Sequence, residues 1–128
     1  MNLLLDTHAL LWWHAKTAAL SDTARRAIDD PANEVYLSLV NVWEIQIKTQ
    51  LGKLPLPKPV AALVDEEITV NGFQVLPVTL EHLYGLDALP LHHNDPFDRL
   101  LIAQAREEGF TLVSRDKPMK AYDVKILW

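Results

Sequence analysis

The sequence predicts an α/β fold with an open parallel sheet of about five strands and helices on both faces. Short apolar, strand-like segments alternate along the chain with segments of helical periodicity. Ten or more residues of helix separate most of the strand-like segments, which favours parallel pairing with right-handed crossovers. The length of 128 residues, with 49% hydrophobic and 23% charged residues, is typical of one globular domain, so we expect a single domain over residues 1–128.

The first half of the chain is expected to hold two strands. The predicted elements are a strand at Met1–Leu5, helix formers at Ala9–Trp13, a helix to about Asp30, a strand at Val35–Leu39 and a helix at Val40–Leu51. Ser21 or Asp22 can cap the helix that ends before Pro31. Gly52 is the expected stop of the longer helix.

The second half begins with a proline-rich loop at Lys53–Pro59. The predicted elements after it are a helix from Val60 to Asn71, a strand at Phe73–Leu76, a helix from Thr79 to about Asp87, a loop at Leu89–Asn94, a helix from Asp95 to Glu108, and strands at Thr111–Val113 and Val124–Leu127. Asp95 and Pro96 combine a capping carboxylate with proline at the first helical position, and Gly109 follows the helix end.

Composition excludes several classes of protein. The absence of cysteine excludes a disulfide scaffold, a thiolate nucleophile and a cysteine-ligated metal. No apolar run approaches the roughly 18 residues of a membrane span, and the first residues carry no basic leader. We therefore expect a soluble, cytoplasmic protein. Its formal net charge of −5 argues weakly against nucleic-acid binding when it is taken alone.

Two acidic residues directly follow predicted strands. Asp6 comes after the first strand, and Asp116 follows the strand at Thr111–Val113 by two residues. In a parallel sheet both would point into the crevice beyond the carboxyl ends of the strands. The alternative is that each only caps a following helix.

Asp98 shares a helix face with apolar residues. The residues three, four and seven positions after it are Leu101, Ile102 and Ala105, so Asp98 is expected on the face that turns toward the sheet. A carboxylate there is costly unless it is paired or bound to a metal. The alternative is an acid in the first helical turn that the helix dipole stabilises, and Asp95 is the plainer cap.

Glu44 also lies in an apolar segment, between Val40 and Ile47. One interpretation is an exposed ion pair with Lys48, four residues on. The other is that Glu44 faces the crevice, because its neighbours are too apolar for a freely solvated helix.

Together, four acids are candidates for one crevice: Asp6, Glu44, Asp98 and Asp116. Four mutually repelling carboxylates require cations. Hard oxygen ligands without cysteine favour Mg²⁺ or Mn²⁺ over zinc. Such ions can activate water and stabilise the charge that develops on a phosphodiester.

The order and spacing of these motifs resemble the PIN-domain nucleases, especially the VapC-type toxins of toxin–antitoxin pairs. The motifs are Leu4-Leu5-Asp6-Thr7, Val42-Trp43-Glu44-Ile45, the segment Asp98–Ala103 and Ser114-Arg115-Asp116. The resemblance covers essentially the whole chain.

The resemblance implies a three-layer α/β/α sandwich and a ribonuclease that uses Mg²⁺ or Mn²⁺. It implies Asp6, Glu44, Asp98 and Asp116 as both the catalytic residues and the metal ligands. Thr7 and Ser114 match supporting polar positions. The segment His93–Asp98 leaves open whether Asp95 or Asp98 is the ligand. A cognate antitoxin, an RNA substrate and a homodimer are the implied partners.

Basic and aromatic residues near these motifs could contact RNA. Lys48 and Arg115 are the main candidates for phosphate contacts, and His8 is a further candidate for substrate contact. His92 and His93 are adjacent and lack an obvious third ligand, so we interpret them as loop histidines.

Tryptophans at helical positions are more often core residues than base-stacking platforms. We therefore expect Trp12, Trp13 and Trp43 in the core. The row from Leu10 to Trp13 exceeds what one buried stripe requires, so part of it is expected to meet another chain.

Two other functions fit parts of the pattern. A phosphoaspartate protein, either a receiver domain or a phosphatase, would also place an Asp after a strand, but His8 stands where the phosphatases have a second Asp. The other alternative is a catalytically inactive PIN-like module that only binds a partner.

Overall fold

A computed structural model describes residues 1–128 and contains a five-stranded, fully parallel sheet. The strands are β1 (Asn2–Leu5), β2 (Glu34–Ser38), β3 (Gln74–Leu76), β4 (Thr111–Val113) and β5 (Ile126–Leu127). Their order is β3-β2-β1-β4-β5, so β1 is central. Leu3 pairs with Val35 of β2, and Leu5 pairs with Val113 of β4. The carboxyl ends of β1 and β4 therefore lie next to each other.

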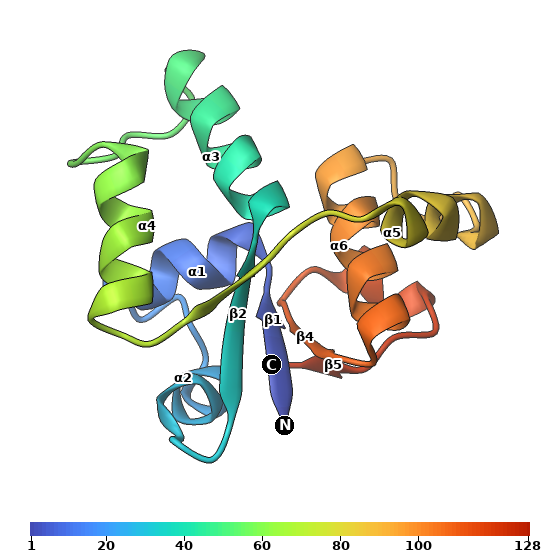
Figure 1. Cartoon of the computed structure of the whole chain (residues 1–128), viewed down its shortest axis with the longest axis horizontal. Helices are drawn as coiled ribbons and strands as arrows, with labels where there is room; N and C mark the ends of the chain where they lie inside the picture. The colour runs from blue at the N-terminus through green and yellow to red at the C-terminus, as the bar shows by residue number, and fades with distance from the viewer.

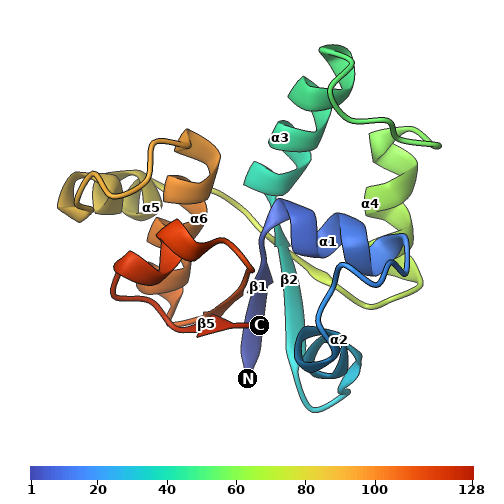
Figure 2. The same cartoon turned by 180° about the vertical axis from the view of Figure 1, so that it is seen from behind.

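Helices cover both faces of this sheet (Figures 1 and 2). They are α1 (Thr7–His14), α2 (Asp22–Asp29), α3 (Leu39–Gln50), α4 (Val60–Thr69), α5 (Leu80–Gly85) and α6 (Pro96–Glu108), with the 3₁₀ turns η1 (Leu86–Ala88) and η2 (Lys117–Ala121). α1 and α2 lie on one face, and α5 and α6 lie on the other. α3 continues from the carboxyl end of β2. The expected α/β/α sandwich is confirmed.

Alternating side chains of β1 build two separate cores. Leu4 packs in the core beneath α6, with Leu101 and Leu112. Leu3 and Leu5 pack in the other, beneath α1 and α2. This alternation is the two-residue period of a strand that is buried on both faces, which is why β1 is apolar without interruption.

Most expected elements are present with small shifts at their ends. Ser21, rather than Asp22, caps α2 through its hydroxyl. α3 begins at Leu39, one residue earlier than expected, because Ser38 caps it together with Asn41. The last strand is shorter than predicted, and the turn η2 was not predicted.

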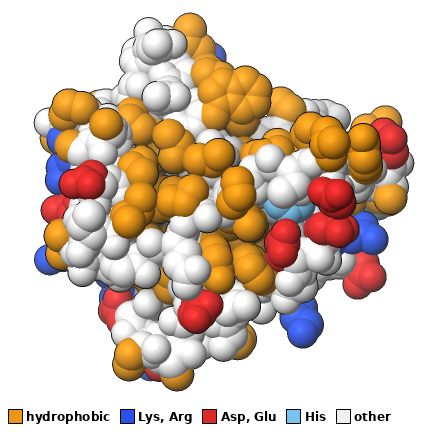
Figure 3. All heavy atoms as spheres, in the orientation of Figure 1, with side chains coloured by type: hydrophobic (Ala, Val, Ile, Leu, Met, Phe, Trp, Pro, Cys, Tyr) orange, Lys and Arg blue, Asp and Glu red, His pale blue; other side chains and the backbone are white.

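The apolar row from Leu10 to Trp13 contributes to the protein's own core, and the expectation that part of it meets another chain stays a prediction. Leu10 is fully buried, and Leu11, Trp12 and Trp13 pack partly buried against the core beneath α1. The large exposed apolar side chains lie elsewhere, at Leu39, Trp43, Leu51, Ile68, Val70, Leu80, Leu83, Tyr84 and Leu91, together with Met1. Figure 3, in the orientation of Figure 1, shows hydrophobic side chains gathered across the middle of this face.

No helix in the structure combines the length and the apolar character that crossing a membrane requires.

Candidate active site

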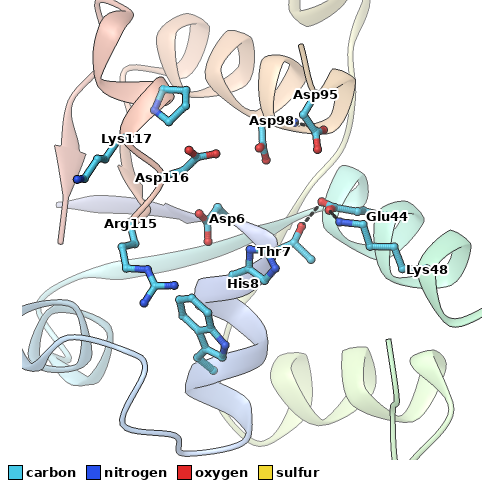
Figure 4. A pocket seen from close by; sticks show the side chains of 12 residues that line it. Asp6, Thr7, His8, Glu44, Lys48, Asp95, Asp98, Arg115, Asp116 and Lys117 are labelled. Atoms are coloured by element: carbon cyan, nitrogen blue, oxygen red, sulfur yellow. Dashed lines mark hydrogen bonds and ion pairs between the residues drawn. The ribbon is translucent and has the colours of Figure 1, made fainter. Parts of the chain in front are cut away.

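An open cavity of about 510 Å³ lies at the carboxyl edge of the sheet and is lined by five carboxylates. We call it the crevice. Its acidic residues are Asp6, Glu44, Asp95, Asp98 and Asp116. They come from the ends of β1 and β4 and from α3 and α6, and Figure 4 shows them facing a common space. The parallel sheet brings them together because adjacent parallel strands end at the same edge.

Asp6 has two roles in the structure. It is the N-cap of α1, where Oδ1 accepts a hydrogen bond of 2.7 Å from the amide of Ala9. Its side chain also lines the crevice, although the residue is only 5% exposed. Burial raises the pKa of the Asp6 carboxyl, and the Asp116 charge adds to the rise, while hydrogen bonds from Ser114 and Ala9 oppose it. The capping and crevice interpretations are therefore both correct for this residue.

Glu44 is held by a buried polar network. The hydroxyl of Thr7 donates to Glu44 Oε1 at 2.6 Å. Asn41 Nδ2 donates to the Thr7 hydroxyl and to the carbonyl of Leu5, both at 3.1 Å. The other Glu44 oxygen pairs with Lys48. Of the two interpretations of Glu44, the exposed ion pair is wrong in its exposure, because the pair with Lys48 forms but Glu44 is only 3% exposed and lines the crevice.

The ammonium of Lys48 is a cation that faces the acids. Partial burial acts to lower the pKa of Lys48, but the hydrogen bond and charge of Glu44 outweigh it, and the charges of Asp95 and Asp98 add to the effect. The net pKa is raised, so Lys48 stays charged and offsets part of the negative charge in the crevice.

Asp95 and Asp98 differ in their contacts. Asp95 caps α6, and its Oδ1 accepts from the amides of Phe97 at 2.8 Å and of Asp98 at 3.2 Å. The Asp98 carboxyl does not cap the helix. Burial, followed by the charges of Asp95 and Glu44 and by Asp116, raises its pKa to about 8. A carboxyl with this pKa indicates a crevice with more negative than positive charge.

His93 joins two of the acids. Its Nε2 lies 3.0 Å from Asp98 Oδ2 and 2.8 Å from Asp116 Oδ2. Its Nδ1 accepts from the amide of Asp95 at 3.2 Å, so the ring proton is on Nε2 and is donated to Asp116 Oδ2. The hydroxyl of Tyr122 accepts from the amide of His93 at 2.9 Å and fixes this loop.

The prediction that both histidines only belong to a loop is therefore incomplete. His92 does turn away, with its ring edge-on to Tyr122 at 5.3 Å, whereas His93 contacts the acids. The signal that could have found His93 is its place two residues before Asp95, the cap of a helix whose first turn enters the crevice.

The other predicted site residues also lie at or beneath the crevice. Lys48 and Arg115 line it, as do Thr7 and His8. Ser114 is fully buried beneath it and accepts from the amide of Asp116 at 3.0 Å. Their functions stay predictions, but every predicted residue is brought to one place.

A family model described as PIN domain matches residues 3–125. The chain belongs to the PIN domain family. The resemblance drawn from the motifs is confirmed, and the phosphoaspartate alternative is not supported. The strand order is also not that of receiver domains, whose sheet runs in the order 2-1-3-4-5.

Known PIN-domain proteins resemble the chain along nearly its whole length. Ribonuclease VapC22 of Mycobacterium tuberculosis is 28% identical over 122 residues, which are 94% of this chain and 92% of the relative. VapBC2 from Rickettsia felis, solved bound to a DNA fragment from their promoter, matches with a TM-score of 0.71 at 15% identity, over 98% of this chain and 97% of that one. VapBC-5 of M. tuberculosis, a member of the VapBC family of toxin–antitoxin systems, matches with a TM-score of 0.62 at 16% identity, over 98% and 96% of the two chains.

The donor set of this PIN domain fits a hard divalent cation. All acidic donors are carboxylate oxygens, the preferred ligands of Mg²⁺ and Mn²⁺. Asp98 and Asp116, with His93, offer three ligand atoms within 4.8 Å of one another. Burial and the neighbouring carboxylates raise the pKa of Asp98 to about 8, so a cation bound beside it would stabilise its ionised form.

Proposed function

We propose that this PIN domain is a divalent-metal-dependent endoribonuclease, and that it is the toxin of a toxin–antitoxin pair. The observation that carries the proposal is the convergence of Asp6, Glu44, Asp98 and Asp116 on one open crevice. Membership of the PIN family and the ribonuclease name of its relative support the choice of reaction.

Mg²⁺ or Mn²⁺, when bound, would supply an activated water and charge stabilisation at the scissile phosphate. Asp6 and Asp98 would hold the main ion. Glu44 would act as a ligand directly or through water, in an orientation set by Thr7 and Lys48. Asp116 would hold a second ion or position the attacking water.

The basic side chains of the crevice would bind the RNA backbone. Lys48 lies on the α3 side and Arg115 on the β4 side, so the two could contact phosphates on either side of the cleaved bond. We also propose a cognate antitoxin and a homodimer as partners. The antitoxin is supported by the toxin–antitoxin description of VapBC-5. Cleavage of cellular RNA would place the protein in the cytoplasm.

The test is cleavage of single-stranded RNA by purified protein freed of any antitoxin. We expect cleavage with Mg²⁺ or Mn²⁺ and none with EDTA. Asp6→Asn should be inactive yet folded, because asparagine is an equally good helix cap. Asp65→Asn, an exposed acid on α4, is the matched control and should keep full activity. Cleavage by a folded Asp6→Asn variant would refute the proposal, as would cleavage in EDTA.

A further inference from the structure

Three side chains at the rim of the crevice form a continuous stack. The ring of His8 lies on the ring of Trp12, with centroids 5.3 Å apart and planes inclined by 20°. The guanidinium of Arg115 lies over the same indole, 4.6 Å from its centroid. His8 and Arg115 are exposed, and Trp12 is half-buried. All three line the same cavity as the acids.

Two members of the stack are close neighbours in sequence of the acidic residues. His8 follows Asp6 by two residues on α1, and Arg115 precedes Asp116 in the loop after β4. Figure 4 shows His8 and Arg115 on the side of the crevice away from Asp95 and Asp98. If the phosphate that is cut lies at the carboxylates, the next nucleoside of the same RNA strand would lie beside the stack.

Trp13 and Trp43 lack this arrangement. Trp13 turns inward, with its ring 4.9 Å from that of Phe73 and its Nε1 donating to Asp29 at 3.0 Å. Trp43, which was expected in the core, is 56% exposed but outside the crevice lining. Its ring lies edge-on to that of Phe97, with centroids 5.1 Å apart.

We propose that His8, Trp12 and Arg115 form a nucleobase-binding subsite, which holds an unpaired base of the RNA strand beside the bond that is cut. Aromatic rings and guanidinium planes are the surfaces on which proteins stack single-stranded bases. This inference rests on the proposed function and deepens it, because it specifies a single-stranded substrate. A base in a duplex is already stacked and cannot enter the subsite.

The test compares two probes that carry the same phosphates. One is a fluorescent single-stranded oligoadenylate, and the other is an oligomer of equal length with abasic riboses. Binding is measured by fluorescence anisotropy in EDTA, where the proposed reaction does not occur. Wild type should bind oligoadenylate about tenfold or more tightly than the abasic oligomer, as the stacking of one or more bases predicts.

Trp12→Leu should abolish this preference by weakening only the binding of oligoadenylate. Trp12→Phe should retain most of it, and Trp43→Leu, the matched control, should leave it unchanged. Equal losses on both probes for Trp12→Leu would overturn the subsite, because they would show a structural role for Trp12. An unchanged preference would overturn it too.

The result is separable from the fate of the proposed function. A base preference that depends on Trp12, in a protein that cleaves no RNA with Mg²⁺ or Mn²⁺, would support the subsite and refute the nuclease. Cleavage by wild type without any base preference would support the nuclease and overturn the subsite.

Discussion

Two groups of side chains in this PIN domain share one composition, a histidine with two carboxylates, but differ in their surroundings. In the crevice His93 lies between Asp98 and Asp116. At the other end of α1, His14 Nδ1 lies 2.8 Å from Glu67 Oε1 and 3.4 Å from Glu66 Oε2. We call this second group the α1–α4 cluster, because it joins those two helices.

The two groups differ in the balance of charge. In the α1–α4 cluster, Lys58 lies 3.4 Å from Glu66, and Asn71 donates to Glu67 at 3.4 Å. Glu67 is fully buried, and burial raises its pKa while His14 opposes the rise. The carboxylates of this cluster thus have a histidine, a lysine and an amide as neighbours, although Glu67 Oε2 is buried without a hydrogen bond and the net pKa of Glu67 is raised.

In the crevice the negative charges outnumber the positive ones, because further carboxylates surround its histidine. Asp6, Glu44 and Asp95 line the same cavity, and the cations of Lys48 and Arg115 do not keep the pKa of Asp98 from rising to about 8. The comparison teaches that residue types alone do not define a site. Uncompensated like charge around an open cavity is the informative feature.

The largest difference between the two groups should appear in catalysis. Asp98→Asn should lower RNA cleavage about a hundredfold or more, because a metal ligand contributes several kcal/mol to the transition state. The measurement is the initial rate at saturating Mg²⁺ with circular dichroism as the folding control. Glu66→Gln, the corresponding change in the α1–α4 cluster, should retain the wild-type rate within about twofold. Equal effects of the two substitutions would remove the distinction between the groups.

A substitution in the α1–α4 cluster should lower the stability of the protein and leave its activity unchanged. His14→Ala leaves the buried Glu67 carboxyl without its hydrogen-bonding partner and should lower the free energy of unfolding by about 2 kcal/mol. The measurement is urea denaturation at neutral pH. Cleavage per folded molecule should be unchanged, and a parallel loss of activity would show that the α1–α4 cluster belongs to the active site.

His93 should affect metal affinity. It donates to Asp116 and lies next to Asp98, both proposed ligands, so His93→Ala should weaken Mg²⁺ binding about tenfold, within the range for residues that orient metal ligands. Isothermal titration calorimetry measures this without any substrate. His93→Gln keeps an N–H donor and should recover part of the affinity. Unaltered binding by the alanine variant would restrict His93 to a structural role.

The smallest expected effect is a dependence of stability on pH in metal-free protein. The folded-state pKa of Asp98, about 8, lies above the ordinary aspartate pKa of 3.8, so the native state binds the proton more tightly than the unfolded chain. This contribution is fully present below about pH 4 and is lost as pH rises toward 8.

Asp98→Asn removes that loss and should raise the melting temperature of metal-free protein at pH 7.5 by about 5 °C. Mg²⁺ should stabilise wild type at that pH, but the variant far less, because Mg²⁺ binds the native state through Asp98. Differential scanning fluorimetry with and without Mg²⁺ is the measurement. Identical Mg²⁺ responses would exclude Asp98 and direct attention to Asp95.

The parallel topology made much of the crevice predictable. Asp6 and Asp116 could be placed because acids after neighbouring parallel strands meet at one edge. Glu44 and Asp98 could be placed because their apolar neighbours turn them inward. Both predictions use only local periodicity and strand order.

His93 and Trp12 depend on contacts that no local pattern contains. His93 reaches the acids because the Tyr122 hydroxyl holds its loop, from 29 residues further along the chain. Trp12 belongs to a stack whose third member, Arg115, lies in the loop after β4, about a hundred residues further along the chain. The apolar neighbours of Trp43 predict a core residue. It is exposed because α3 extends away from the sheet.

The capping bond of Asp6 has a consequence for preorganisation. Oδ1 is held by the Ala9 amide, so the torsions of the side chain are already restricted before any cation arrives. The conformational entropy of ordering this side chain is therefore lost during folding, when α1 forms, and not during ion binding. The same hydrogen bond keeps the second oxygen of Asp6 oriented whether or not substrate is present. The first turn of α1 therefore fixes the position of this carboxylate in the crevice.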